Sequence, residues 1–125
     1  MSSSFTIVVF VTRKSSLSPA EFREHWENKH IPLLRSLAGP CFPLNHTRHY
    51  LKRDESSPSH PISILVGDSA DITFDAFAVV SFANEAAFQH FVPIMTSPEV
   101  LKDEERFTDR AQLKAVVLGD IMATL

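Results

Sequence analysis

The sequence predicts an α+β protein with the ferredoxin-like order β-α-β-β-α-β and a four-stranded antiparallel sheet. Four apolar segments are typical of strands, and the segments between them combine helical spacing with helix-capping residues. The 125 residues can bury one hydrophobic core but not two. We therefore expect a single domain over residues 1–125.

The first strand and the first helix have clear signals. Residues 5–12, FTIVVFVT, are β-branched and aromatic without a helical period, which is typical of a strand buried on both faces. Ser18 is a good N-cap, Pro19 suits the first helical position, and Glu21 completes a capping box. The helix is therefore predicted to begin at Pro19.

A proline interrupts this first helix. Pro32 removes a backbone donor and crowds the preceding turn. We therefore expect a kink or break near His30 and a shorter turn that ends around Leu37. Residues 43–53 then alternate in polarity and predict the second strand.

A long connection precedes the third strand. Residues 54–61 are rich in Ser and Pro and predict a loop, whereas 62–72 are ambiguous because their apolar centre has loop-like flanks. Residues 73–82, TFDAFAVVSF, predict the third strand. Long irregular loops in compact domains are often functional, so 54–72 could cover the mouth of a pocket as a lid.

The C-terminal part supplies the second helical region and the last strand. Asn84 caps a helix that Pro93 is expected to close, because the residue before a proline avoids the helical region. Ser97 and Pro98 start a short helix through Glu105, and 111–122 predict the fourth strand. The inward row of the helix after Asn84 would be Phe88, Phe91 and Val92.

Composition excludes several classes of partner. A net charge of −3 without a basic stripe argues against nucleic acid, because phosphate binding needs clustered Lys and Arg. The apolar runs fall short of the ~20 residues of a membrane-spanning helix. The one cysteine, Cys41, cannot form an internal disulfide, and no leader segment is visible, so we expect a cytoplasmic protein.

No cofactor is expected either. The chain has three glycines and no Gly-rich phosphate loop, so a nucleotide cofactor is not predicted. The His, Asp and Glu residues do not follow the spacings of known metal sites. A serine nucleophile elbow is also absent from the sequence. Acid–base chemistry by histidine remains, since its ordinary pKa of about 6.5 suits proton transfer near neutral pH.

The sheet itself predicts a homodimer. Three of the four predicted strands are apolar on both faces, but helices from one chain can cover only one face. Leaving the other face in water would cost about 25 cal/mol for each Å² of apolar surface. A second copy of the chain, packed sheet against sheet about a two-fold axis, is the simplest cover.

One histidine of the first helix is expected to point inward. Helical spacing places His25 toward water and His30 toward the sheet, where a buried imidazole needs a hydrogen-bond partner. That partner could be a backbone carbonyl freed by Pro32, which would make His30 structural, or His30 could serve a functional site. The full inward stripe would be Phe22, Trp26, His30, Leu33 and Leu37.

The second strand strengthens the functional alternative. Side chains alternate along a strand, so one face has His46, Arg48 and Tyr50 and the other has Thr47, His49 and Leu51. Only one of the two histidines can therefore face His30; the other alternative is that the polar face simply lies in water at a sheet edge. The predicted pocket would suit a flat aromatic or polyketide-like ligand and would be walled by Phe22, Trp26, Phe88, Phe91 and Met95.

Three motifs resemble a known family. The segments LSPAEFREHWENKHIPLL, NHTRHYLKR and DEERFTD are similar to the EthD-like branch of the dimeric α+β barrel superfamily, and to its small fungal members. The resemblance implies a ferredoxin-like fold that dimerises through its sheets. It also implies cofactor-free chemistry on polyketides, by decarboxylases, dehydratases, cyclases or monooxygenases. The family's histidine would be His30, and its acidic pair Asp103 and Asp109.

Our leading hypothesis is a cofactor-free lyase that decarboxylates or dehydrates an aromatic polyketide. His30 with His46 or His49 would move the proton, while Arg48 or Tyr50 would hold a carboxylate or carbonyl. Asp75 could orient an imidazole or simply bond backbone in a turn. Asp103 and Asp109 are interpreted as structural, as caps or as partners of Arg106 and Arg110. The alternatives are an anthrone monooxygenase, a polyketide cyclase and a non-catalytic ligand-binding barrel.

Overall fold

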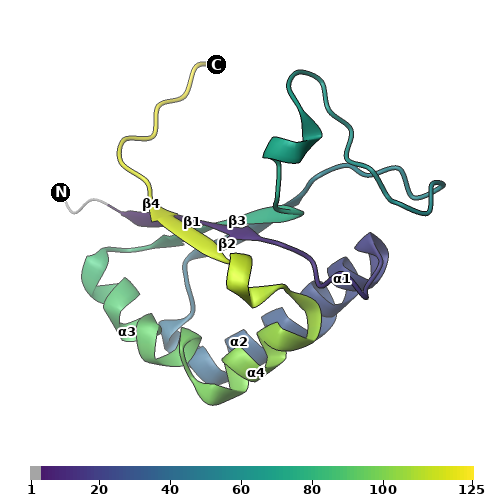
Figure 1. Ribbon diagram of the computed structural model, residues 1–125. Helices are drawn as coiled ribbons and strands as arrows, with labels where there is room; N and C mark the ends of the chain where they lie inside the picture. Colours follow the sequence, from purple (N-terminus) through teal and green to yellow (C-terminus); the bar gives the residue numbers. More distant parts are fainter. Residues whose placement is uncertain (1–3) are drawn as a thin grey trace.

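The computed structural model describes residues 4–125 and confirms the ferredoxin-like arrangement (Figure 1). An antiparallel sheet of order β2-β3-β1-β4 has the helices on one face only. The strands are β1 (Phe5–Val11), β2 (Asn45–Tyr50), β3 (Ala76–Phe82) and β4 (Lys114–Val117). The main helices are α1 (Pro19–His25), η1 (Trp26–His30), α2 (Ile31–Ala38), α3 (Glu85–Met95) and α4 (Pro98–Phe107).

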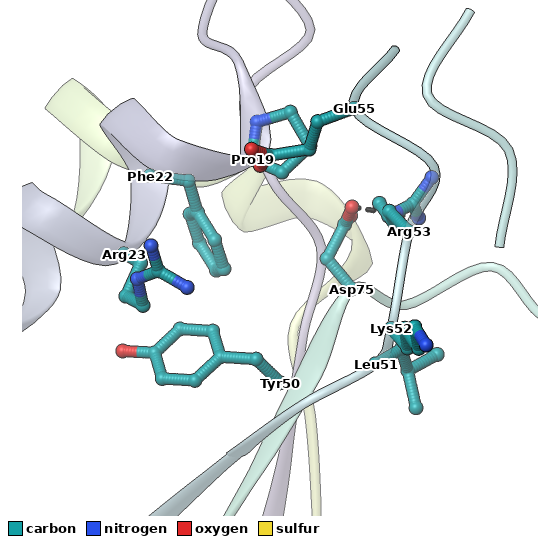
Figure 2. Close-up of a pocket in the computed structure, with 9 residues that line it drawn as sticks. All are labelled: Pro19, Phe22, Arg23, Tyr50, Leu51, Lys52, Arg53, Glu55 and Asp75. Atoms are coloured by element: carbon teal, nitrogen blue, oxygen red, sulfur yellow. Dashed lines mark ion pairs between the residues drawn. The ribbon is translucent and has the colours of Figure 1, made fainter. Parts of the chain in front are cut away.

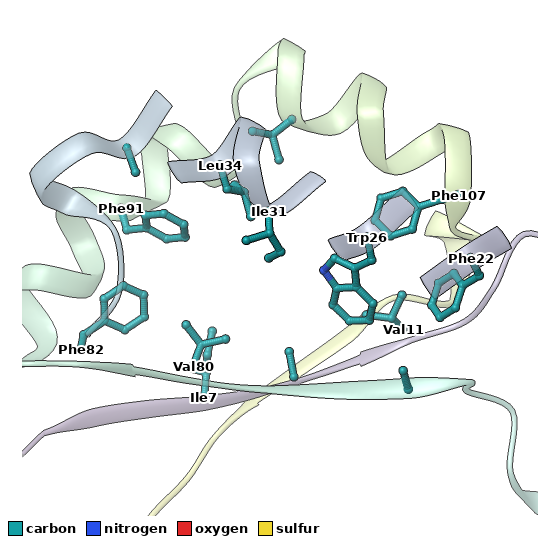
Figure 3. Close-up of a cluster of buried hydrophobic side chains, with 14 residues drawn as sticks. Ile7, Val11, Phe22, Trp26, Ile31, Leu34, Val80, Phe82, Phe91 and Phe107 are labelled. Carbon is teal, nitrogen blue, oxygen red and sulfur yellow. The ribbon is translucent and has the colours of Figure 1, made fainter. Parts of the chain in front are cut away.

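The core lies between the sheet and the helices (Figure 3). Alternate residues of the two central strands point toward the helices, among them Ile7 and Val11 of β1 and Val80 of β3. Aromatic side chains from α1, η1, α3 and α4 meet them. These aromatic core residues are Phe22, Trp26, Phe91 and Phe107.

The first helical segment begins as predicted and contains a wide turn. Both bonds of the capping box form: the Glu21 amide donates to Ser18 Oγ over 3.1 Å, and the Ser18 amide donates to Glu21 Oε1 over 2.9 Å. The expected irregularity near His30 is a π-helical turn, η1, in which the Ile31 amide donates to the Trp26 carbonyl. Because Pro32 has no amide proton to continue the α-helical pattern, the chain accommodates one extra residue before it.

The π-turn changes which residues face the core after it. Leu33 and Leu37 were expected on the inward stripe, but Leu37 is 38% exposed and Leu33 is only half-buried. Leu34 and Ala38 are buried instead, 6% and 5% exposed. An additional residue in one turn shifts the inward positions by one, so the prediction from a uniform 3.6-residue period was wrong here.

Several other boundaries differ from the prediction: β2 is Asn45–Tyr50 and not 43–53, β3 begins at Ala76 and not at 73, and α4 ends at Phe107 and not at Glu105. Helix α3 continues past Pro93 to Met95, with the Thr96 amide bonded to the Val92 carbonyl over 3.0 Å. The fourth strand, expected over 111–122, is only Lys114–Val117. Val117 pairs with Ile7 of β1, and the Leu118 amide still donates to the Thr6 carbonyl over 2.8 Å; beyond that bond the chain leaves the sheet (Figure 1).

The connection between β2 and β3 does not cover the helical side. It contains the short turn η3 (Ser69–Asp71) and a β-bridge between Arg53 and Ile62. Figure 1 shows it extending from the end of the sheet on the side opposite the helices. Glu55 of this segment lies beside Pro19 of α1, and the rest of the lid expected over 54–72 does not lie over the space between helices and sheet (Figure 1). No helix within residues 4–125 is long and apolar enough to cross a membrane.

The second sheet face, which we call the open face, has no helix against it (Figure 1). Its central rows are apolar: Val79 pairs with Val8, and Phe77 pairs with Phe10. Val116 of β4 continues the first row and is 50% exposed. This arrangement agrees with the sequence argument that helices of one chain cover only one face.

Candidate functional site

A buried hydrogen bond between a histidine and a carboxylate joins the π-turn to α4. His30 and Asp103 are 4% and 5% exposed, and His30 Nδ1 lies 2.8 Å from Asp103 Oδ2. The partner of His30 is therefore a carboxylate, and the expected alternative, a backbone carbonyl freed by Pro32, is not the one that forms. Because the carboxylate accepts the proton on Nδ1, the neutral ring has its lone pair on Nε2.

Asp103 also holds a second histidine. His25 Nε2 lies 3.1 Å from both carboxylate oxygens, and its ring stacks on Phe107 with centroids 4.7 Å apart. The expectation that His25 points to water was wrong, because α4 covers that face of α1. The expected pairing of Asp103 with Arg106 is present over 3.4 Å, and the Asp103 carboxylate is buried.

The environment sets the charge of this pair. Burial lowers the pKa of His30 below 6.5, although Asp103 opposes the shift. Burial also works against ionisation of Asp103, but the hydrogen bonds from His30 and His25 hold its pKa below 3.8. Near neutral pH the site therefore holds a carboxylate and a neutral imidazole.

A cavity of about 120 Å³ opens beside His30. Its wall is mostly apolar and includes Trp26, Phe91 and Met95, as predicted, together with His46 of β2. A cavity of about 150 Å³ holds a benzene ring, so this one has room for roughly a single aromatic ring. A fused polycyclic ligand could insert one ring and would have to extend outside with the rest.

His46 is the second-strand histidine that shares this cavity. Arg48 Nη1 lies 3.0 Å from His46 Nδ1, and since arginine can only donate, the proton of the neutral imidazole is on Nε2. Burial and the Arg48 charge lower the pKa of His46 to about 4. His30 and His46 therefore offer opposite functions at Nε2, an acceptor on one ring and a donor on the other.

Glu27 of the π-turn fixes Arg48 and Tyr50. Arg48 Nε and Nη2 donate to the two oxygens of Glu27 over 2.6 and 3.0 Å, and the Tyr50 hydroxyl donates to Glu27 Oε2 over 2.6 Å. We call these three residues the Glu27 clamp. The clamp occupies both side chains that were expected to hold a substrate carboxylate or carbonyl.

Three of the predicted site residues lie elsewhere. His49 is on the open face, stacked on Phe77 with centroids 4.8 Å apart, so it cannot act with His30. Phe88 packs against Phe5 and Phe82 and is not part of the cavity wall. Phe22 is 1% exposed and packs in the core beside Trp26.

Asp75 belongs to a separate hollow of about 410 Å³ (Figure 2). It accepts from the Arg13 amide and side chain over 2.7 and 3.2 Å, and from Arg53 Nη2 over 2.7 Å. These contacts join the start of β3 to neighbouring segments and leave Asp75 away from both His30 and His46. Its predicted role in orienting an imidazole therefore has no geometric support.

Two carboxylates have roles that the sequence did not indicate. Asp103 was interpreted as structural, a cap or a partner of Arg106, without its bonds to the two histidines; Val100, Asp103 and Phe107 share one helical face, a spacing that could have indicated its burial. Glu104 lines the cavity and accepts from Arg110 Nε over 2.9 Å. Burial raises the pKa of Glu104 above 4.5 despite that arginine. Within residues 4–125, no three His, Cys, Asp or Glu side chains are arranged to hold a metal ion.

Solved structures with the same fold come from several bacteria. An ethyl tert-butyl ether D (EthD) family protein of Bacillus halodurans is 17% identical, with a TM-score of 0.55 and 95% of this chain and 100% of that chain covered. SnoaB, a cofactor-independent oxygenase of Streptomyces nogalater, is 14% identical, with a TM-score of 0.52 and coverage of 96% and 95%.

A dimeric ferredoxin-like protein of unknown function from Thermobifida fusca is 14% identical, with a TM-score of 0.50 and coverage of 94% and 92%. At these identities the likeness shows the fold alone. No curated protein matches the chain. The family model of the EthD domain matches residues 14–111, which include η1, β2 and α4. Since this match spans most of the sequence, and agrees with the motifs around His30 and Asp103, the chain belongs to the EthD family.

Proposed function

We propose that this protein is a cofactor-free lyase that removes carbon dioxide or water from an aromatic polyketide-type molecule. The observation that supports it is the pairing of His30 and His46 in one apolar cavity with opposite protonation at Nε2. One ring can take a proton while the other donates a hydrogen bond to an oxygen that gains charge. Asp103 acts as a positioning residue, because it fixes the tautomer of His30.

The dehydration route uses the neutral form of His30. Its Nε2 would remove a proton from the carbon next to a carbonyl, while His46 Nε2–H donates to that carbonyl oxygen as it becomes an enolate. The enolate electrons then expel the neighbouring hydroxyl, which leaves as water with the proton from His30. The product is an aromatic ring, and both histidines return to their starting forms.

The decarboxylation route uses protonated His30. The bond between the ring or chain carbon and the carboxylate breaks, carbon dioxide leaves, and the electron pair moves to a carbonyl oxygen bonded to His46. His30 Nε2–H then protonates the carbon, and solvent restores that proton. Asp103 stabilises the imidazolium that this route requires, which burial alone would disfavour.

Purified protein incubated with a panel of hydroxylated anthrones and anthraquinone carboxylic acids, followed by mass spectrometry, tests this proposal. We expect loss of carbon dioxide or water, and a fall in rate of about 100-fold or more for His30→Gln and His46→Gln. The matched control is His49→Gln, on the opposite face of the same strand. Full activity of a folded His30→Gln variant would contradict the assignment of His30.

The same experiment decides between the lyase and an oxygenase. SnoaB, which shares the fold, is a cofactor-independent oxygenase, so each incubation is run under oxygen and under nitrogen. A product that requires oxygen and gains an oxygen atom would assign a monooxygenase. If no compound reacts and His30→Gln only lowers stability, the cavity is that of a binding protein.

The protein is further proposed to be a homodimer that packs through the open face. The apolar rows around Val8, Phe10, Phe77 and Val79 have no cover from the helices of their own chain. Burying such rows against a second copy would recover about 25 cal/mol for each Å² of apolar surface. Analytical ultracentrifugation at micromolar concentration checks this, and a monomer would refute it.

A further inference from the structure

An ion pair links the wall of the cavity to a neighbouring open hollow, which Arg110 lines and which shares Thr108 with the cavity. Glu104 of α4 lines the cavity and is 19% exposed, whereas its partner Arg110, in the short turn η4 (Arg110–Gln112), is 41% exposed. One hydrogen bond of 2.9 Å, from Nε to Oε1, links the two side chains. Within residues 4–125, Arg110 Nη1 and Nη2 have no hydrogen-bond partner.

The ion pair of Glu104 and Arg110 is easier to separate than that of Glu27 and Arg48. Arg48 binds Glu27 through two parallel hydrogen bonds and a third nitrogen, Nη1, is bonded to His46. Arg110 has a single bond to a carboxyl whose pKa burial already raises, so the protein holds Glu104 in its charged form at some cost. Arg110 therefore retains the donors needed for a forked contact with another carboxylate.

We propose that Glu104 and Arg110 form an exchangeable ion pair that selects aromatic carboxylates for the His30 cavity. The ring of the ligand enters the cavity and its carboxylate accepts two hydrogen bonds from the Arg110 guanidinium. The hydrogen bond between Arg110 and Glu104 breaks. This inference rests on the proposed function and narrows it, because it makes arene carboxylic acids the preferred ligands.

The exchange is feasible because the carboxylate of the ligand replaces the carboxylate of Glu104 as the partner of Arg110. The charge beside Arg110 is the same before and after, provided that Glu104 takes a proton or turns to solvent when it is released. A neutral ligand of similar shape gains nothing from Arg110, so it has to bind through the cavity wall alone. Replacing Arg110 would then lower the affinity for ligands that have a carboxylate and leave the affinity for neutral ligands of the same shape unchanged.

Trp26 gives a direct test of binding, because it is the only tryptophan of the chain and lines the cavity. Its fluorescence is titrated with benzoate and, separately, with phenol, for the wild type and for each variant. Arg110→Gln should weaken benzoate binding about tenfold, the effect of one charge-assisted contact, and leave phenol binding unchanged. Glu104→Gln should strengthen benzoate binding by about tenfold, because Arg110 no longer has a competing carboxylate.

Two further variants complete the design. Arg110→Lys keeps the positive charge and should retain most of the benzoate affinity. It shows whether the loss in Arg110→Gln comes from the missing charge or from a folding defect. Glu99→Gln, an exposed carboxylate in the first turn of the same helix, is the matched control for Glu104→Gln and should leave benzoate affinity unchanged.

The outcomes separate the two proposals. If phenol and benzoate both bind but neither Arg110→Gln nor Glu104→Gln alters benzoate affinity, the exchange is refuted while the proposed function stands. If neither compound changes the Trp26 signal, the cavity does not accept aromatic rings, and both proposals fall.

Discussion

Replacing His46 by glutamine should remove a large part of the acid sensitivity of this protein. In the unfolded chain His46 has an ordinary pKa of about 6.5, whereas burial and Arg48 lower it to about 4 in the fold. A group with a depressed folded-state pKa contributes stability that is complete above pH 6.5. That stability is lost as the pH falls toward 4, because the unfolded chain binds the proton first.

The size of the effect follows from the shift. Each pKa unit corresponds to 1.36 kcal/mol, so a shift from 6.5 to about 4 makes the free energy of unfolding fall by about 3 kcal/mol across this interval. The lowered pKa of His30 acts in the same direction and should leave part of the slope in the variant. The side-chain amide introduced by His46→Gln would keep an oxygen to accept from Arg48, so stability at pH 7 should change little.

Urea denaturation at several pH values between 7 and 4.5 measures this slope. His49→Gln is the control, since His49 lies on the same strand but stacks on the open face. We expect the control to keep the slope of the wild type and His46→Gln to reduce it clearly. Equal slopes for the wild type and His46→Gln would refute the burial of a neutral imidazole at this position.

Three further predictions concern other contacts. Asp103→Asn should destabilise the fold by about 2 kcal/mol, because two hydrogen bonds to a buried carboxylate become neutral ones; urea unfolding at pH 7 measures it. Glu27→Gln should lower the pKa of Tyr50, which burial and Glu27 raise above 10; spectrophotometric titration of this single tyrosine detects it. Phe77→Lys places a charge in the centre of the open face and should convert the proposed dimer to monomers in sedimentation.

Each of these has a control and a contrary result. Asp109→Asn, whose carboxylate accepts only from Gln112 within residues 4–125, should cost much less than Asp103→Asn, and equal costs would refute the central role of Asp103. An unchanged Tyr50 titration in Glu27→Gln would mean that the clamp does not form. Gln89→Lys, on an exposed part of α3, should leave the sedimentation coefficient unaltered, and a persistent dimer of Phe77→Lys would exclude the open face as its interface.

Local signals predicted the order of the elements and the start of the first helix, because capping at Ser18 and the apolar strands depend on nearby residues. The π-turn could only be foreseen as an irregularity near His30, since a missing amide at Pro32 is compatible with a kink or with a wider turn. That choice decided whether Leu33 or Leu34 faces the core. The early end of β4 has no local signal, because apolar residues follow Val117 and β1 extends two residues beyond Ile7, to Phe5.

The site was predictable in part for the same reason. Alternation separated His46 from His49 correctly, but which of them faces the helices depends on how β2 lies against β3. Asp103 forms its bonds with His25 and His30, more than seventy residues earlier in the chain, so no local pattern reveals them. The apolar wall of Trp26, Phe91 and Met95 was easier to predict, because helical spacing alone points these side chains inward.

The Glu27 clamp helps to fix the register of β2, an edge strand whose one neighbour in the sheet is β3. Sliding β2 by one residue would turn His46 outward and bring Thr47 or His49 into the helical layer. Glu27 of η1 accepts hydrogen bonds from two alternate residues of this strand, Arg48 and Tyr50. A shift of β2 by one residue would break these bonds and is therefore unfavourable. The alignment of the two cavity imidazoles, His30 and His46, is thus maintained by a carboxylate that is not part of the cavity wall.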